Sequence, residues 1–178
     1  MSNSENQAAP LGAAVQRFDL SDRVVVVAGA SKGIGRELMI PLAETGAVVV
    51  PTVRIEADAE SITAEARSRS LTAHPQRLDI RDAASINEAV SRILVAHGRI
   101  DVRVNNAGLG FARAAFDVTE ADWDEMMAVH LRGAFFMSQA AARATGESGR
   151  GGRIVNISSQ GSLVGLRDAA VYCAARAA

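Results

Sequence analysis

Short, wholly apolar stretches alternate with longer stretches of helical periodicity from Arg23 onward. A short apolar run rich in valine predicts a strand buried on both faces, and strands that alternate with helices predict a parallel sheet. We therefore expect a doubly wound α/β fold. The expected strands lie near residues 24–29, 47–50, 76–79, 101–106 and 153–158, and the expected helices near residues 34–45, 56–69, 82–97 and 119–145.

The first expected strand leads into a glycine-containing loop within the segment RVVVVAGASKGIGR, residues 23–36. Glycines let a backbone turn tightly and approach a ligand closely. The first amides of the following helix carry positive partial charge, so the segment predicts a phosphate-binding site. Its spacing, G-x-x-x-G-x-G, differs from the G-x-G-x-x-G fingerprint and from a P-loop. A purely structural turn is the simpler alternative.

The composition is that of one soluble globular domain. The chain has 178 residues, of which 48% are hydrophobic and 22% charged, and a net charge of −1. Nothing in this balance suggests nucleic acid or an acidic membrane surface as a partner. No apolar stretch approaches the ~18 residues of a membrane span, and the N-terminus lacks the pattern of a secretory signal. The single cysteine, Cys173, fits a reducing cytoplasm.

Two further segments carry candidate chemistry. Asn105-Asn106-Ala107-Gly108 ends the fourth expected strand, where small residues allow close approach to a ligand. Ser159 follows the fifth expected strand, Tyr172 comes 13 residues later, and Arg176 another four residues on. Positions i and i+4 share one helix face, so Arg176 can reach toward Tyr172, the only tyrosine of the chain.

The strings AGASKGIG and NNAG, with this serine-to-tyrosine spacing, resemble the short-chain dehydrogenase/reductases over residues 17–178. The resemblance implies a Rossmann-type sheet of strand order 3-2-1-4-5 and hydride transfer between NADP(H) and a small carbonyl or alcohol substrate. Residues 17–178 would form the dinucleotide-binding domain, after a flexible extension at residues 1–16. The cofactor-binding residues it implies are Gly29, Ser31, Lys32, Gly33, Ile34, Gly35, Arg54, Asp79, Ile80, Asn105, Asn106, Ala107 and Gly108.

Two cations favour NADP over NAD. The resemblance expects an acid at the end of the second strand for NAD, but Val53 occupies that place and Arg54 follows it. Lys32 adds a second cation, although both could be solvated surface charges. Pro51 predicts that the strand ends or bulges there, which would move Arg54. Asp79 is expected at the adenine, or alternatively as the cap of the next helix.

The implied catalytic tetrad of asparagine, serine, tyrosine and lysine has two departures in this chain, which has His130, Ser159, Tyr172 and Arg176. Tyr172 would exchange a proton with the substrate, assisted by a nearby cation because a free phenol ionises near pH 10. Ser159 would hold the substrate oxygen, and Arg176 would supply the cation and bind the nicotinamide ribose. Most of the apolar stripe around His130, from Trp123 to Phe135, is expected to be core.

Family members usually continue through two more strands, so we expect a sheet truncated after its fifth strand. An apolar edge strand favours association, and we expect a homo-oligomer. Two alternatives remain open: an NADP-binding protein without turnover, and a degenerate or truncated family member. His74 and His97 have no ligand-like spacing to His130, so no metal is expected.

Overall fold

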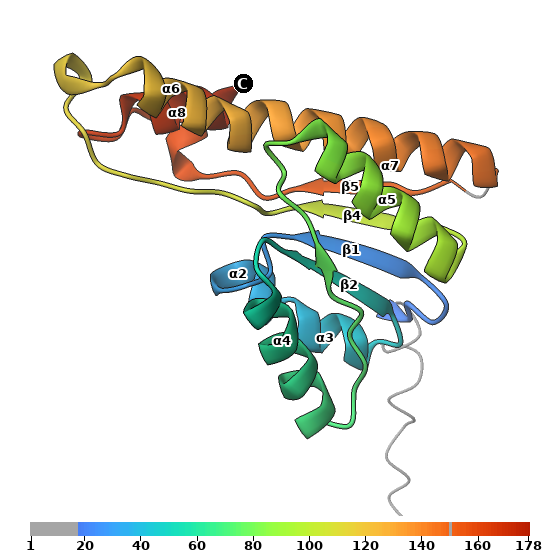
Figure 1. Cartoon of the computed structure of the whole chain (residues 1–178). Coiled ribbons are helices and arrows are strands. Elements are labelled where there is room, and N and C mark those ends of the chain that lie inside the picture. Colours follow the sequence, from blue (N-terminus) through green and yellow to red (C-terminus); the bar gives the residue numbers. More distant parts are fainter. Residues whose placement is uncertain (1–17, 150) are drawn as a thin grey trace, which may run out of the picture.

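The computed structural model describes residues 18–149 and 151–178 (Figure 1). Five parallel strands form one sheet of order β3-β2-β1-β4-β5. This order confirms the expected doubly wound α/β class, whereas the expected extension at residues 1–16 lies outside the described part. The strands are β1 (Val24–Ala28), β2 (Val48–Val53), β3 (Gln76–Arg77), β4 (Val102–Asn105) and β5 (Arg153–Asn156).

Helices cover the two faces of the sheet in two groups (Figure 1). One face carries α2 (Gly33–Glu37), α3 (Met39–Glu44) and α4 (Glu56–Ser68). The other carries α5 (Ala83–His97), α6 (Glu120–Met127), the π-helical turn η3 (Ala128–Gly133), α7 (Ala134–Ser148) and α8 (Ala170–Ala177). Two 3₁₀ turns, η2 (Ala115–Asp117) and η4 (Gln160–Ser162), lie in the connections.

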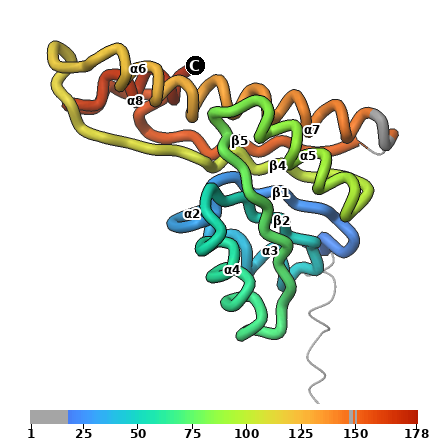
Figure 2. The backbone as a smooth tube through the Cα atoms, viewed as in Figure 1, coloured from blue at the N-terminus to red at the C-terminus, as the bar shows by residue number. Residues whose placement is uncertain are grey.

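Strand β1 forms the centre of the core because both of its faces are buried. Val24 and Val26 pack into the cluster beneath α5 and α7, whereas Val25 and Val27 pack into the cluster beneath α3 and α4. This division follows from the alternation of side chains along a strand. The polypeptide trace in Figure 2 shows β4 running beside β1, although helices and two strands separate them in the sequence.

The expectation for Pro51 was wrong, because β2 continues through it to Val53 and pairs it with Val27 of β1. The hydrogen bonds of β2 alternate between its neighbours. The amide of Val48 donates to the carbonyl of Arg23, directly before β1, whereas the carbonyl of Val49 accepts from the amide of His74, in the segment before β3. By this alternation the position of Pro51 faces the short strand β3, where a missing N–H interrupts little of the ladder.

The helix expected at residues 119–145 is interrupted by η3, which changes the phase of its buried face. Met126 before the turn and Met137 after it are buried. Three members of the expected core stripe, Trp123, Leu131 and Phe135, are instead 47%, 39% and 59% exposed. A π turn inserts an extra residue, so a stripe counted at a constant 3.6 residues per turn drifts out of register from η3 onward, at Leu131 and Phe135. The prediction that most of this stripe is core therefore holds only in part, because Met126 and His130 are buried and Met127 is partly buried.

Candidate functional site

The loop after β1 is locked to the loop after β4. Gly29 has a φ of +65°, and a Cβ atom added there would lie 2.7 Å from the Cα atom of Ala107. The Asn106 side chain donates from Nδ2 to the carbonyls of Ala28, at 2.9 Å, and Gly29, at 3.1 Å. A Cβ atom on Gly35 would lie 2.5 Å from the Gly29 carbonyl oxygen. Both glycine positions therefore exclude larger side chains.

A cleft of about 670 Å³ opens beside the contact of these two loops, at the carboxyl ends of β1, β2 and β4. Most of the predicted cofactor-binding residues line it. They are Gly29, Ser31, Lys32, Gly33, Ile34, Arg54, Asp79, Ile80, Asn106, Ala107 and Gly108. The two predicted residues that do not line the cleft are Gly35 and Asn105. Gly35 is packed against the Gly29 carbonyl, and the Asn105 side chain hydrogen-bonds to Ser138 and Asn156.

Lys32 and Arg54 both line the cleft, with exposed side chains. Arg54 follows β2 directly, and Val53 beside it is 3% exposed. Because no carboxylate takes the place of Val53, neither cation is neutralised from the end of β2. The cleft therefore offers two cations to an anionic ligand.

Asp79 is held by Arg81, a residue that the sequence analysis missed. The Arg81 guanidinium donates from Nε and Nη2 to the two carboxylate oxygens at 2.9 and 2.6 Å. These hydrogen bonds hold the pKa of Asp79 below its ordinary value, with Arg54 contributing at longer range. The cap of α5 is Asp82, which accepts from the amide of Ala84 at 2.8 Å, so the alternative role of Asp79 as a cap was wrong.

Asn105 joins the ends of β4 and β5 to α7. Its Nδ2 donates to Asn156 Oδ1 and to Ser138 Oγ, both at 2.7 Å. Asn156 is its direct partner in the register of the two strands. The sequence analysis missed Asn156, yet asparagines that end neighbouring parallel strands must meet at one sheet edge.

Tyr172 reaches the site from the first turns of α8. A Cβ atom on Gly161 of η4 would lie 3.2 Å from Tyr172 Cε1, and Ser159 Oγ accepts from the Gly161 amide at 3.2 Å. Tyr172 lines an opening of about 600 Å³ that shares Lys32, Gly108 and Leu109 with the larger cleft. The fold therefore brings Ser159, Tyr172 and the glycine loop to one end of the sheet.

His130 and Arg176, the two departures from the tetrad, contact each other. Arg176 Nη1 lies 3.2 Å from His130 Nδ1, and Arg176 Nη2 donates to the Ser158 carbonyl at 2.9 Å. The Arg176 Cζ atom is 5.7 Å from the centre of the Tyr172 ring. The Arg176 guanidinium thus lies beside the Tyr172 ring.

The contacts of His130 fit a neutral imidazole with its proton on Nε2. That nitrogen lies 2.7 Å from the Leu109 carbonyl oxygen, which can accept a hydrogen bond from it, while Nδ1 faces the guanidinium donor of Arg176. The Leu109 amide, at 3.2 Å from the same Nε2, is the weaker contact because that nitrogen cannot donate and accept at once. Burial lowers the pKa of His130, and the Arg176 charge adds to this, although the bond to Leu109 opposes it.

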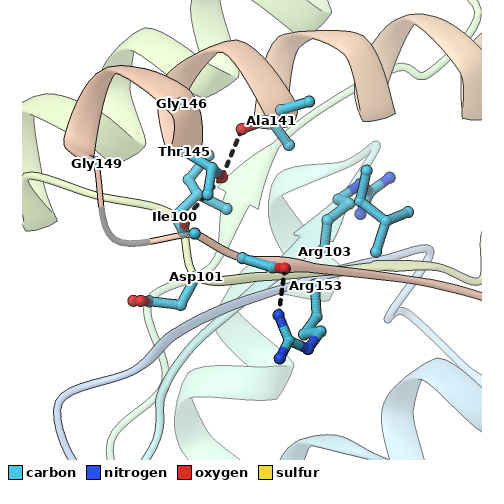
Figure 3. Close-up of a pocket in the computed structure, with 12 residues that line it drawn as sticks. Ile100, Asp101, Arg103, Ala141, Thr145, Gly146, Gly149 and Arg153 are labelled. Atoms are coloured by element: carbon cyan, nitrogen blue, oxygen red, sulfur yellow. Dashed lines mark hydrogen bonds between the residues drawn. The ribbon is translucent and has the colours of Figure 1, made fainter.

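A separate cavity of about 410 Å³ lies beneath α7 at the amino ends of β4 and β5 (Figure 3). Arg103 lines it and is 1% exposed. Its Nη1 donates to the Val104 carbonyl, but Nε and Nη2 have no partner in the described part of the chain. Asp101 points away and bonds Arg23 and the Val24 amide instead. Burial lowers the pKa of Arg103 to about 9.

Residues 18–149 and 151–178 contain neither a cluster of metal-binding side chains nor a helix that could span a membrane. In this part of the chain no three histidine, cysteine, aspartate or glutamate side chains are grouped to hold a metal ion. No described helix is both long and apolar enough to cross a membrane.

A parallel sheet with a glycine loop at the carboxyl end of its central strand defines a Rossmann-type nucleotide-binding protein. More narrowly, the chain belongs to the short chain dehydrogenase family, whose pattern it matches over residues 23–178. This match confirms the resemblance inferred from the two glycine-containing strings and the serine-to-tyrosine spacing. Members of the family are oxidoreductases that use NAD or NADP.

Individual relatives agree with this placement. The chain is 36% identical to a NAD-dependent glycerol dehydrogenase of Listeria innocua, over 90% of this chain and 62% of that protein. A metagenomic short-chain oxidoreductase crystallised with NADP superposes with a TM-score of 0.83 at 34% identity, covering 89% of this chain and 72% of the other. A short-chain type dehydrogenase/reductase from Mycobacterium marinum gives 0.87 at 28% identity, covering 92% and 67%. The chain spans about three fifths of the length of the Listeria innocua dehydrogenase.

Proposed function

We propose that this chain is part of an NADP(H)-dependent oxidoreductase that interconverts a small carbonyl compound and its alcohol. One observation carries the proposal. The opening lined by Tyr172 shares Lys32, Gly108 and Leu109 with the glycine-loop cleft, so a dinucleotide in the cleft has a proton-exchanging phenol beside it. Reduction requires a hydride donor and a proton donor at one substrate, and the reverse oxidation requires a hydride acceptor and a proton acceptor there.

The residues of the cleft fit a dinucleotide with an extra phosphate. A Cβ atom on Gly33 would meet nothing within 4 Å, so the loop leaves its backbone open to a ligand. Lys32 and Arg54 place two cations in the cleft, whose carboxylates are Asp58, Asp79 and Glu125, and the last two are both paired with Arg81. The two cations support NADP over NAD, because a 2′-phosphate needs positive partners and a ribose hydroxyl does not.

NADPH, when bound, supplies the hydride that reduces the carbonyl carbon. Tyr172 donates its phenolic proton to the carbonyl oxygen, which becomes the alcohol. The Arg176 cation stabilises the tyrosinate that remains, because its guanidinium lies 5.7 Å from the ring centre. Ser159, held at the N-terminus of η4, hydrogen-bonds the substrate oxygen. In the reverse direction Tyr172 accepts the proton of the alcohol.

An NADP-binding protein without turnover is the second candidate. The departures at His130 and Arg176 favour it, because arginine stays protonated and cannot pass a proton onward as lysine can. The two candidates share the binding step and differ in the rate of NADPH oxidation with a reactive ketone.

Calorimetric titration of NADPH and NADH tests the cofactor assignment. We expect NADPH to bind about 10–100-fold more tightly, because each charge-assisted contact contributes ~1.5–3 kcal/mol before entropy losses. Arg54→Ala should remove most of this preference while leaving NADH affinity unchanged. Arg69→Ala, an exposed arginine at the end of α4 and outside the cleft, is the matched control. Equal affinities of the parent chain for both cofactors would remove the assignment.

The proposal extends to a cytoplasmic homo-oligomer. The exposed apolar residues of α7 and β5, namely Phe135, Phe136, Ile154 and Val155, support association. The single cysteine supports a reducing compartment. A monodisperse monomer in light scattering at micromolar concentration would contradict the oligomer.

A further inference from the structure

We propose that His130 and Arg176 form one interdependent pair, in which His130 is a positioning residue that holds the Arg176 cation beside Tyr172. The inference rests on the proposed function, in which Tyr172 exchanges the proton. It concerns the two positions at which this chain departs from the family tetrad, and it assigns them a joint role.

The guanidinium of Arg176 is fixed by two contacts. Nη2 donates to the Ser158 carbonyl at 2.9 Å, and Nη1 lies 3.2 Å from His130 Nδ1. Its Nε atom is buried and has no hydrogen-bond partner among the described residues. His130 is therefore the one side chain of the described part that directs this cation by a hydrogen bond.

The imidazole is itself held in the orientation that this contact requires. Nε2 lies 2.7 Å from the Leu109 carbonyl oxygen, so it carries the proton and leaves the Nδ1 lone pair for Arg176. Gly108 provides the space, because a Cβ atom there would lie 2.9 Å from His130 Cε1. The Tyr172 ring meets the imidazole edge to face, with ring centres 5.5 Å apart. The π turn η3 that carries His130 is a local distortion of a kind often found at functional sites.

The charges around the pair require a neutral His130. Arg176 and Tyr172 face it from α8, and Lys32 lines the same opening. On its own turn, Arg132 points elsewhere and donates to the Arg81 carbonyl. Apart from the chain end at Ala178, no carboxylate of the described residues lines the two openings that His130 borders. A proton on Nδ1 would place two cations against each other with no acidic side chain beside them, so the pair works only with the neutral ring.

This arrangement makes the two departures contingent on each other. Arg176→Lys leaves His130 without its guanidinium partner, and His130→Asn presents a shorter side chain that withdraws the acceptor from Arg176 Nη1. The double substitution restores the family combination of asparagine and lysine. We therefore expect each single change to lower kcat for ketone reduction at least fivefold, and the double variant to equal or exceed the parent chain. Single effects that simply add in the double variant would overturn the pairing.

A second measurement does not depend on turnover. Nitrogen-15 NMR of the three histidines in the full chain should show His130 as the neutral Nε2–H tautomer at pH 7. Arg176→Met should raise the pKa of His130, because the Arg176 charge helps to lower it. Arg176→Lys should keep it low, and His74 and His97 should not move. The Nδ1–H tautomer, or a His130 titration that is the same in Arg176→Met, would overturn the proposal.

The two measurements separate the pair from the enzymatic function. If no variant reduces a ketone, the proposed function fails, while the tautomer and the titration still decide the pair. A change at His130 can disturb the π turn η3 and with it the fold. Arg176 lies at the end of α8, so Arg176→Met is expected to leave the fold intact, and circular dichroism of this variant checks that it does.

Discussion

Strands β1 and β5 show how differently the two halves of this sheet are supported. All five residues of β1 are at most 3% exposed, with strands on both sides and helices on both faces. All four residues of β5 are exposed, including Ile154 at 44% and Val155 at 43%, and β5 pairs with β4 alone. The half that carries the nucleotide cleft therefore forms a complete core, whereas the half that carries the catalytic candidates is held by fewer contacts.

Buried polar groups divide in the same way. Around the cleft, Asn106 satisfies the carbonyls of the glycine loop and Arg81 neutralises Asp79. Beneath α7, the buried guanidinium of Arg103 keeps two unpaired nitrogens. An unpaired buried charge costs free energy that no local contact offsets. The polar groups that border the cleft are therefore better satisfied than the guanidinium of Arg103 beneath α7.

The largest expected effect separates catalysis from binding. Tyr172→Phe removes the phenolic proton and should lower kcat for ketone reduction by ~10²–10⁴-fold, the usual contribution of a positioned acid or base. NADPH affinity should change less than twofold, because Tyr172 lines the neighbouring opening and not the cleft itself. Stopped-flow NADPH oxidation and calorimetry measure the two quantities. An unchanged kcat in Tyr172→Phe would falsify the assignment of Tyr172 and favour binding without turnover.

The next largest effect is a loss of stability in the half of the sheet that carries the cleft. A Cβ atom on Gly35 would lie 2.4 Å from Asn106 Nδ2 and 2.5 Å from the Gly29 carbonyl oxygen. Gly35→Ala should therefore separate the two loops and lower the free energy of unfolding by about 2–3 kcal/mol, in the upper range for overpacking. Urea denaturation measures this loss.

Gly146→Ala in α7 is the matched control, because a Cβ atom there meets nothing within 4 Å. It should raise stability by ~0.5–1 kcal/mol, since alanine favours a helix interior over glycine. Equal stabilities of the two variants would contradict the close approach of the loops.

The smallest effect improves the less satisfied half. Arg103→Met keeps an apolar side chain in the core and removes the unpaired nitrogens, so the free energy of unfolding should rise by about 1–2 kcal/mol at pH 7. Burial lowers the pKa of Arg103 to about 9 in the folded chain, and unfolding removes that burial and returns the pKa to its higher ordinary value. The unfolded state thus binds more protons between these values, and the parent chain should regain stability relative to the variant above pH 9. A destabilised Arg103→Met would mean that the guanidinium has a stabilising partner.

The sequence predicted the sheet well because its strands are dictated by local patterns. The valine runs of β1 and β2 are apolar on both faces and must therefore be buried on both. Strands that alternate with helices along the chain form a parallel sheet. Pro51 was misjudged because its cost depends on which neighbouring strand its missing amide faces. The exposed stripe around Phe135 was misjudged because a π turn is invisible to a constant helical period.

Residues that line the cleft through their own position, such as Gly29 and Arg54, could be named from the sequence. The contacts between pairs of side chains could not. Arg81 satisfies Asp79 from two residues away, but the contact between His130 and Arg176 spans 46 residues and depends on the tautomer of a ring. Periodicity and spacing carry no information on such a contact, because α8 meets η3 only in the folded chain.

The hydrogen bond from Asn106 to Gly29 joins residues 77 positions apart, and this distance sets a delay during synthesis. A ribosome that adds about 5–20 residues per second releases the glycine loop roughly 4–15 s before the asparagine that closes it. During that interval β1 and β2 can pair, but the loop has no clamp and no fourth strand beside it. A nucleotide can therefore bind only to chains in which β4 has paired with β1. Its binding stabilises the last step in the assembly of the cleft and not the first.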